Sequence, residues 1–184
     1  MGKRSNFERK PRDFYPTPYE AVVPLIPHLE PGTDFHEPCA GNGQLTCLLE
    51  SYAGQMCMGE SDICPQPDDD GIRYEEIYEI DALKLEECGI GHEADIFITN
   101  PPWSRDILHP LITHLSDIAP TWLLFDADWM HTKQSAEFMP RLRKIVSVGR
   151  VKWIPDSKMT GKDNCCWYLF DKPSSEPTIF YGRE

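Results

Sequence analysis

The segment Asn100-Pro101-Pro102-Trp103 directly follows the apolar run ADIFIT, and its residue types could do chemistry. Two successive prolines stiffen the turn and fix the directions of its carbonyl groups. The Asn100 side-chain oxygen and a backbone carbonyl can therefore accept both hydrogens of one planar amino group, while the Trp103 ring stacks on the ring that bears it. Two acceptors push such an amine towards a tetrahedral, nucleophilic form, without a metal or a covalent intermediate. A proline-ended turn with no chemical role is the plainer alternative.

A second candidate group, Glu37-Pro38-Cys39-Ala40-Gly41-Asn42-Gly43, follows a predicted strand. Gly41 and Gly43 allow a tight turn and let a ligand approach the backbone closely. Thr46 stands where a dinucleotide-binding fingerprint has its third glycine or alanine, which argues against a nicotinamide or flavin cofactor. An ordinary turn is the alternative interpretation of two glycines alone.

An acidic side chain ends the next predicted strand. Asp62 lies nineteen residues after Gly43, where a carboxylate can accept hydrogen bonds from both hydroxyls of a ribose. Glu60 competes for this role, because strand ends are uncertain by a few residues. A surface acid in an acidic region is the alternative.

The elements that must position these groups alternate between strands and helices. Hydrophobic patterns predict strands over 33–37, 55–63, 74–80, 94–99 and 121–126, helices over 44–53 and 107–118, short helices within 19–29 and over 136–143, and late antiparallel strands over 145–154 and 166–170. This order predicts an α/β fold with a mostly parallel central sheet and helices on both faces. Ligands of such sheets lie beyond the carboxyl ends of the strands. By this rule, we expect residues 37–43, 60–62, 81 and 100–103 to lie close together at one edge of the sheet.

Taken together, these segments resemble the S-adenosylmethionine-dependent methyltransferases with an NPPY/F/W motif, above all the small phage-type DNA adenine-N6 methyltransferases. The resemblance spans residues 13–170, because Asp13-Phe14-Tyr15-Pro16-Thr17-Pro18 is similar to the family's amino-terminal cofactor motif and Gly149–Phe170 to its tail. It implies a Rossmann-like class I methyltransferase fold. It also implies S-adenosyl-L-methionine as cofactor, S-adenosyl-L-homocysteine as product and adenine in DNA as the methyl acceptor.

The resemblance implies roles for individual residues. The positions matching the family's cofactor site are Tyr15, Thr17, Pro18, Glu37, Pro38, Gly41, Gly43, Asp62 and, more weakly, Asp81. The catalytic positions are Asn100, Pro101, Pro102 and Trp103, of which Trp103 also contacts the substrate. The basic, polar segment 152–162 between two predicted strands is the expected substrate loop, with Lys152, Lys158 and Lys162 as binding residues.

The length of 184 residues predicts one catalytic domain over 13–184, preceded by a basic arm over 1–12 and lacking a separate target-recognition domain. Trp129 is interpreted as a packing aromatic and His131 receives no role. Seven cysteines without CxxC spacing indicate a reduced, cytoplasmic protein without a metal site. We expect no membrane segment, because no run of 18 apolar residues occurs. The oligomeric state stays open.

The charge distribution bears on the substrate. The formal net charge is -12, yet thirteen acidic and two basic residues fall within 59–100, while basic residues dominate 1–12 and 133–162. If both basic segments fold onto one face, that face can follow a phosphate backbone. Solvated surface is the alternative explanation.

Two other functions stay open at this stage. An RNA base or a protein glutamine also presents a planar amino group, and the net charge of -12 modestly favours a substrate other than DNA. A non-catalytic, cofactor-binding regulatory protein is the second alternative, against which the intact Asn100–Trp103 motif argues.

Overall fold

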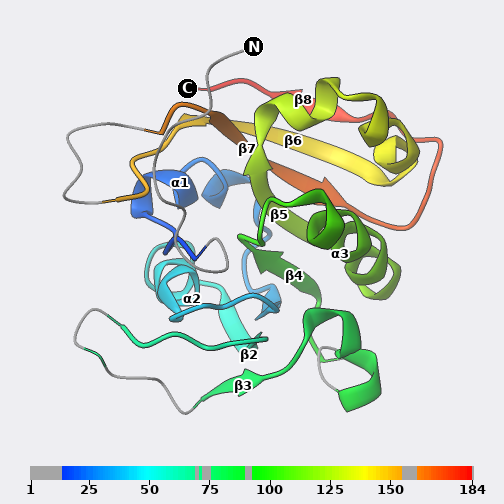
Figure 1. Cartoon of the computed structure of the whole chain (residues 1–184). Coiled ribbons are helices and arrows are strands. Elements are labelled where there is room, and N and C mark those ends of the chain that lie inside the picture. Colours follow the sequence, from blue (N-terminus) through cyan, green and yellow to red (C-terminus); the bar gives the residue numbers. More distant parts are fainter. Residues whose placement is uncertain (1–13, 69–70, 72–75, 90–92, 155–160, 184) are drawn as a thin grey trace.

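The computed structural model describes residues 14–68, 71, 76–89, 93–154 and 161–183, which build an eight-stranded sheet of order β3-β2-β1-β4-β5-β7-β6-β8 (Figure 1). The strands are β1 Asp34–Glu37, β2 Met56–Asp62, β3 Ile77–Glu79, β4 Ile96–Thr99, β5 Thr121–Asp126, β6 Leu142–Arg150, β7 Asn164–Phe170 and β8 Ile179–Tyr181. Strands β1 to β5 pair in parallel, and β7 runs antiparallel to both β5 and β6. The mostly parallel sheet with a late antiparallel pair is thus confirmed.

Helices cover both faces of the sheet, as predicted (Figure 1). The α-helices are α1 Tyr19–Val22, α2 Gln44–Leu48 and α3 Arg105–Ile118; the 3-10 helices are η2 Ile26–His28, η4 Ala82–Lys84, η5 Glu86–Cys88, η6 Ala127–His131 and η7 Lys133–Arg141; and η3 Leu49–Ala53 is a π-helix. Alternation along β5 divides the core. Leu123 and Phe125 pack with side chains of α3, η6 and η7, while Trp122 and Leu124 pack with those of α1 and α2.

Some elements differ from the sequence prediction. The helix predicted over 136–143 is the 3-10 helix η7, which contains Pro140; proline lacks the N–H that an α-helix interior needs. The helix predicted over 44–53 continues from α2 into the π-helix η3. Strand β8, which pairs in parallel with β6, was not predicted.

Several predictions fall outside the described residues. The basic arm over 1–12, Asp13 and Lys158 belong to these. Within the part that is described, no helix combines the length and apolar character needed to cross a membrane. Trp129, with 4% of its surface exposed, is buried, which confirms its interpretation as a packing aromatic.

Candidate active site

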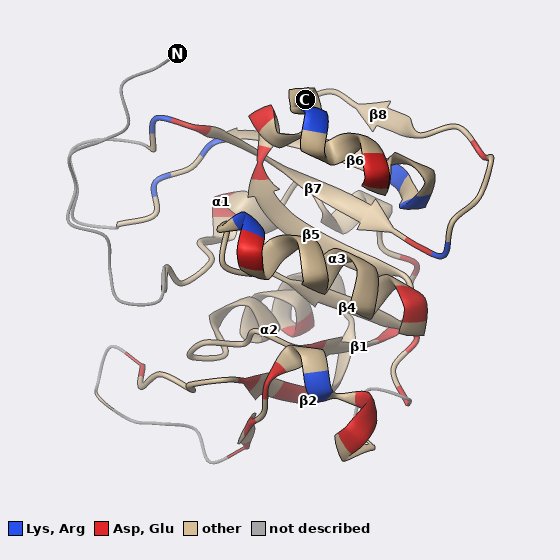
Figure 2. Ribbon diagram, turned by 45° about the vertical axis from the view of Figure 1, so that its right-hand side comes forward, with Lys and Arg blue, Asp and Glu red and all other residues tan. Residues whose placement is uncertain are grey.

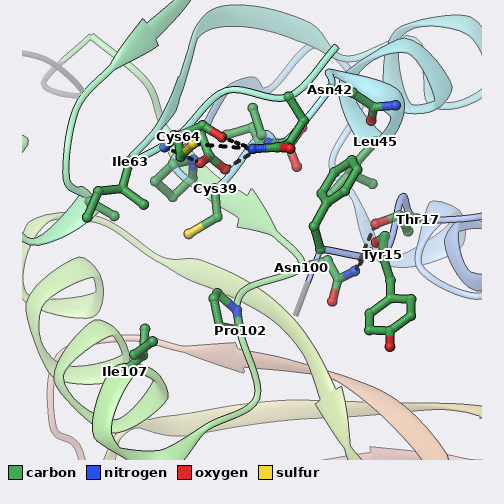
Figure 3. A pocket seen from close by; sticks show the side chains of 18 of the residues that line it. Tyr15, Thr17, Cys39, Asn42, Leu45, Ile63, Cys64, Asn100, Pro102 and Ile107 are labelled. Carbon is green, nitrogen blue, oxygen red and sulfur yellow. Dashed lines mark hydrogen bonds between the residues drawn. The ribbon is translucent and has the colours of Figure 1, made fainter. Parts of the chain in front are cut away.

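A cavity of about 580 Å³ opens at the carboxyl ends of β1, β2 and β4 (Figure 3). Its lining joins segments that are far apart in the sequence: the amino-terminal stretch 14–17, the glycine turn after β1, the loop after β2, residues 81–83 and the turn after β4. Of the residues expected at the cofactor site, Tyr15, Thr17, Glu37, Pro38, Gly41, Asp62 and Asp81 line it. Pro18 and Gly43 do not.

The glycine turn is shaped by its neighbours as well as by its own residues. Gly41 and Gly43 have φ angles of 59° and 77°, in the left-handed region that glycine adopts readily. A Cβ at Gly41 would lie 2.6 Å from a ring carbon of Phe14. The turn therefore needs glycine at position 41 both for its backbone and for the approach of the amino-terminal segment.

Glu37, at the end of β1, is a buried acid with 2% of its surface exposed. Its Oε2 accepts hydrogen bonds from the backbone N–H of Thr46 at 3.1 Å and from the Thr46 hydroxyl at 2.8 Å. Burial raises the pKa of Glu37 well above its ordinary value, and the nearby Glu60 and Asp62 raise it further, against the opposing effect of Thr46. Thr46 was noted in the sequence only as a departure from a fingerprint. In the structure, Thr46 of α2 donates hydrogen bonds to Glu37 at the end of β1.

Asp62, rather than Glu60, faces the cavity. The Oδ2 atom of Asp62 accepts a hydrogen bond from the Gly41 N–H at 2.9 Å, and its Oδ1 accepts one from Cys64 N–H at 2.7 Å. Glu60 does not line the cavity; its Oε1 would lie 3.2 Å from a Cβ at Gly43. Asp62 is thus held against the glycine turn with its carboxylate at the cavity wall.

Asn100 is held by the amino-terminal segment (Figure 3). Its Nδ2 donates to the hydroxyl of Thr17 at 3.1 Å and to the Tyr15 carbonyl at 3.4 Å. Its Oδ1 accepts a hydrogen bond from Trp103 Nε1 at 3.3 Å. Asn100 and Pro102 line the cavity, while Pro101 is buried and does not.

Trp103 lies on the other side of the turn. Its Nε1 also donates to the Leu124 carbonyl of β5 at 3.1 Å, and its ring meets that of Trp153 edge to face, with centroids 5.7 Å apart. Trp103 lines a second cavity, of about 570 Å³, beyond the carboxyl ends of β5 and β6. The turn after β4 thus contributes Asn100 to one cavity and Trp103 to the other.

The second cavity contains charged residues that the sequence did not single out. Its polar lining consists of Arg105, Asp126, Asp128, Thr132, Arg150, Lys162, Asp163 and Asn164. Burial raises the pKa of Asp126 above its ordinary value. Of the expected substrate residues, Lys162 lines this cavity, whereas Lys152 lines neither and donates its backbone N–H to Glu20 Oε1. The position of Asp126 at the end of a predicted strand was the signal that could have marked it.

The comparisons with known proteins identify the fold. No protein-family model matches the chain, and no curated protein sequence matches it. Similar solved structures include a modification subunit of a putative type I restriction enzyme from Vibrio vulnificus (TM-score 0.56, 15% identity, 92% of this chain and 47% of that chain covered). A putative class I S-adenosylmethionine-dependent methyltransferase from Listeria monocytogenes is similar at TM-score 0.55 and 9% identity, with 89% and 63% covered.

A third similar structure is a putative RNA methyltransferase from Pyrococcus horikoshii, at TM-score 0.50 and 16% identity, with 88% of each chain covered. The chain spans about half the length of the modification subunit, at 47%. The chain therefore has the fold of the class I methyltransferases, and the Rossmann-like architecture expected from the sequence is confirmed.

Proposed function

We propose that the protein is an S-adenosylmethionine-dependent methyltransferase that methylates the N6 amino group of adenine in DNA, of the small phage-type family. The observation that carries this proposal is the turn after β4. Asn100 borders the cavity with the acids Glu37 and Asp62, and the neighbouring Trp103 borders the second cavity. A methyl donor and a ring-bearing amine on the two sides of this turn would meet at the Asn100 side chain.

The first cavity has acceptors that suit S-adenosylmethionine. Asp62 could accept hydrogen bonds from ribose hydroxyls, Glu37 could offer a carboxylate to the positive charge of the methionine end, and Asp81, which also lines the cavity, could accept from the adenine. The cofactor, when bound, would supply an electrophilic methyl group to the acceptor nitrogen; the S–CH3 bond would break, S-adenosyl-L-homocysteine would leave, and the methylated amine would lose one proton to water. The glycine at position 41 admits the ring of Phe14, which brings the amino-terminal segment to the cavity wall.

The chain's own residues prepare the amine. Asn100 Oδ1 and the Pro101 carbonyl accept the two amino hydrogens, which localises the nitrogen lone pair away from the ring. Trp103 provides an aromatic surface for the base. Since an adenine inside a duplex cannot reach such a site, the base is flipped out or taken from a single strand.

Cations at the second cavity are compatible with a nucleic acid as the acceptor. Arg105, Arg150 and Lys162 line it together with the acids Asp126, Asp128 and Asp163. Figure 2 shows basic segments, with an acidic one beside them, where β6 ends and β7 begins, and further acidic segments around β2. The three cations could pair with the phosphates next to a bound base.

The proposal is tested with labelled S-adenosylmethionine offered with duplex DNA, single-stranded DNA, RNA or a protein extract, each separately. Acceptors are digested and the methylated nucleoside or residue is identified by mass. We expect N6-methyladenine in DNA, strongly reduced for Asn100→Ala and unchanged for Gln134→Ala, an exposed amide on η7. Label confined to RNA or to glutamine would replace DNA by that acceptor. Cofactor binding without any transfer would favour a regulatory role.

A further inference from the structure

We infer that Thr17 is a positioning residue, whose hydroxyl holds the Asn100 amide in the orientation that the Tyr15 carbonyl and the Trp103 indole select, with the amide oxygen facing the acceptor amine. This inference rests on the proposed function, because it concerns the same reaction. The sequence resemblance assigns Thr17 to the cofactor. The contacts in the structure give it a second partner, 83 residues away, in the Asn100 side chain.

The Tyr15 carbonyl can only accept a hydrogen bond and the Trp103 indole can only donate one, so together they identify the nitrogen and the oxygen of the Asn100 amide. A backbone carbonyl only accepts, so the Asn100 atom 3.4 Å from the Tyr15 oxygen must be the donor Nδ2. An indole N–H only donates, so the Asn100 atom 3.3 Å from Trp103 Nε1 must be the acceptor Oδ1. Turning the amide over would set oxygen against oxygen at Tyr15 and N–H against N–H at Trp103.

Thr17 makes the shorter of the two contacts that hold the amide nitrogen, at 3.1 Å against 3.4 Å for the Tyr15 carbonyl. Its side chain is buried, with 4% of its surface exposed, so water competes little for the hydroxyl. The Thr17 hydroxyl accepts a hydrogen bond from Asn100 Nδ2 and so does not occupy the oxygen Oδ1. Trp103 uses one lone pair of Oδ1, and the other stays available for a substrate N–H.

This arrangement links the wall of the first cavity to the side chain proposed to act on the acceptor. The segment Phe14–Thr17 lines the first cavity and, through Thr17, also holds the side chain proposed to act on the acceptor. The residues Phe14–Thr17 would therefore contact a bound cofactor and also hold the Asn100 amide in place. A positioned acceptor matters because small misplacements of reacting groups lower rates strongly.

The test compares Thr17→Val, which keeps the side-chain shape but has no hydroxyl, with Thr17→Ser, which keeps the hydroxyl. Single-turnover methyl transfer is measured at saturating S-adenosylmethionine, and the cofactor Kd is measured separately by calorimetry. We expect Thr17→Val to transfer roughly 10- to 100-fold more slowly even at saturating cofactor, and Thr17→Ser to recover most of the rate. An undiminished rate, or a defect that saturating cofactor removes, would show that Thr17 serves cofactor binding alone.

Thermal unfolding of Thr17→Val, Asn100→Ala and the double variant provides a measurement that does not depend on activity. If the hydrogen bond is present, the decreases in melting temperature of the two single variants add to more than the decrease of the double variant. Simple additivity would overturn the hydrogen bond. Wild-type protein that transfers to no acceptor defeats the proposed function and the positioning role together, whereas active wild type with an unaffected Thr17→Val defeats the positioning role alone.

Discussion

Among single side chains, Glu37 has the most conflicting requirements. Its carboxyl is buried and its pKa is raised mainly by that burial, yet the proposed cofactor carries positive charge at the methionine end and calls for a carboxylate there. Thr46 donates two hydrogen bonds to this carboxyl, which offset the effect of burial only in part. The ionised form that binding requires is thus the form that burial disfavours.

Replacing Glu37 by Gln separates these two requirements. Since the folded pKa is raised above an ordinary value near 4.5, the stability that Glu37 contributes is fully present below that value and is lost as the pH rises towards the folded pKa. A glutamine does not ionise. We expect Glu37→Gln to melt at a higher temperature than the wild type at pH 7, with the difference shrinking towards pH 4.5.

The same variant is expected to bind S-adenosylmethionine at least about tenfold more weakly, because glutamine cannot make a charge-assisted hydrogen bond to the positive methionine end. Melting curves across pH and calorimetric titration measure the two effects. Glu176→Gln, at an exposed acid, is the matched control. Parallel melting profiles for wild type and Glu37→Gln would contradict the account of the buried carboxyl.

Most of the candidate site could be predicted at this scale, since Gly41 and Asn100 follow strands and Asp62 ends one. The choice between Asp62 and Glu60 could not, because both lie in β2 and have the same parity along the strand. What separates them is the Gly41 N–H that Asp62 accepts, a hydrogen bond between segments that no local pattern specifies. The role of Thr46 beside Glu37 depends on three-dimensional packing for the same reason.

At the scale of elements, the turn between β4 and α3 is pinned to the neighbouring strand. Trp103 donates to the Leu124 carbonyl of β5 and packs with side chains from both faces of the sheet. The same N–H reaches Asn100 Oδ1. The indole therefore has a structural role in holding the turn as well as its proposed role as a surface for the base.

Two variants of Trp103 distinguish these roles. Trp103→Phe keeps an aromatic ring but removes the N–H, and we expect a transfer rate several-fold lower; Trp103→Ala also removes the stacking surface and should be about 100-fold slower, given ~1–3 kcal/mol per stacked base. Both should bind S-adenosylmethionine normally, because Trp103 does not line the first cavity. Rapid-quench kinetics and calorimetry measure the two quantities. Equal transfer rates for Trp103→Phe and Trp103→Ala would show that stacking on residue 103 does not contribute to the rate.

Element prediction succeeded where apolar runs were long and failed where they were short. β4 and β5 were anticipated closely because both are buried, continuous apolar strands. β8 has three residues and an exposed Ile179 and Phe180, so only its pairing with β6 defines it. The apolar spacing over 136–143 indicated a helix, but spacing alone does not distinguish an α-helix from a 3-10 helix around Pro140.

On the scale of the whole molecule, cations lie towards both ends of the strand pair of β6 and β7. Arg150 ends β6 opposite Asn164, and Lys162 lies just before β7, beside the second cavity. Lys144 and Lys172 lie towards the other end of the same pair. This arrangement offers two matched pairs of cations that differ in position and not in charge.

Removing the charges of Arg150 and Lys162 should affect DNA binding more than removing those of Lys144 and Lys172. The slope of log K against log salt becomes shallower by about 0.9 for each phosphate that the protein no longer neutralises. We therefore expect the double variant Arg150→Gln with Lys162→Gln to bind DNA more weakly and to have a slope shallower by about 2. The double variant Lys144→Gln with Lys172→Gln should leave the slope unchanged. Binding titrations over a salt series measure it. Equal effects of the two pairs would indicate attraction by overall charge instead of an interface at the second cavity.

The central claim is that Asn100 directs a methyl group to an exocyclic amine of adenine. The most direct measurement is single-turnover transfer to an adenine-containing DNA oligonucleotide, with the methylated atom identified after digestion. At saturating S-adenosylmethionine, the account predicts N6-methyladenine from the wild type, and from Asn100→Ala a rate about 10²- to 10³-fold lower, comparable to removing one preorganised catalytic hydrogen bond. Methylation of a ring nitrogen, or an undiminished rate from Asn100→Ala, would contradict it.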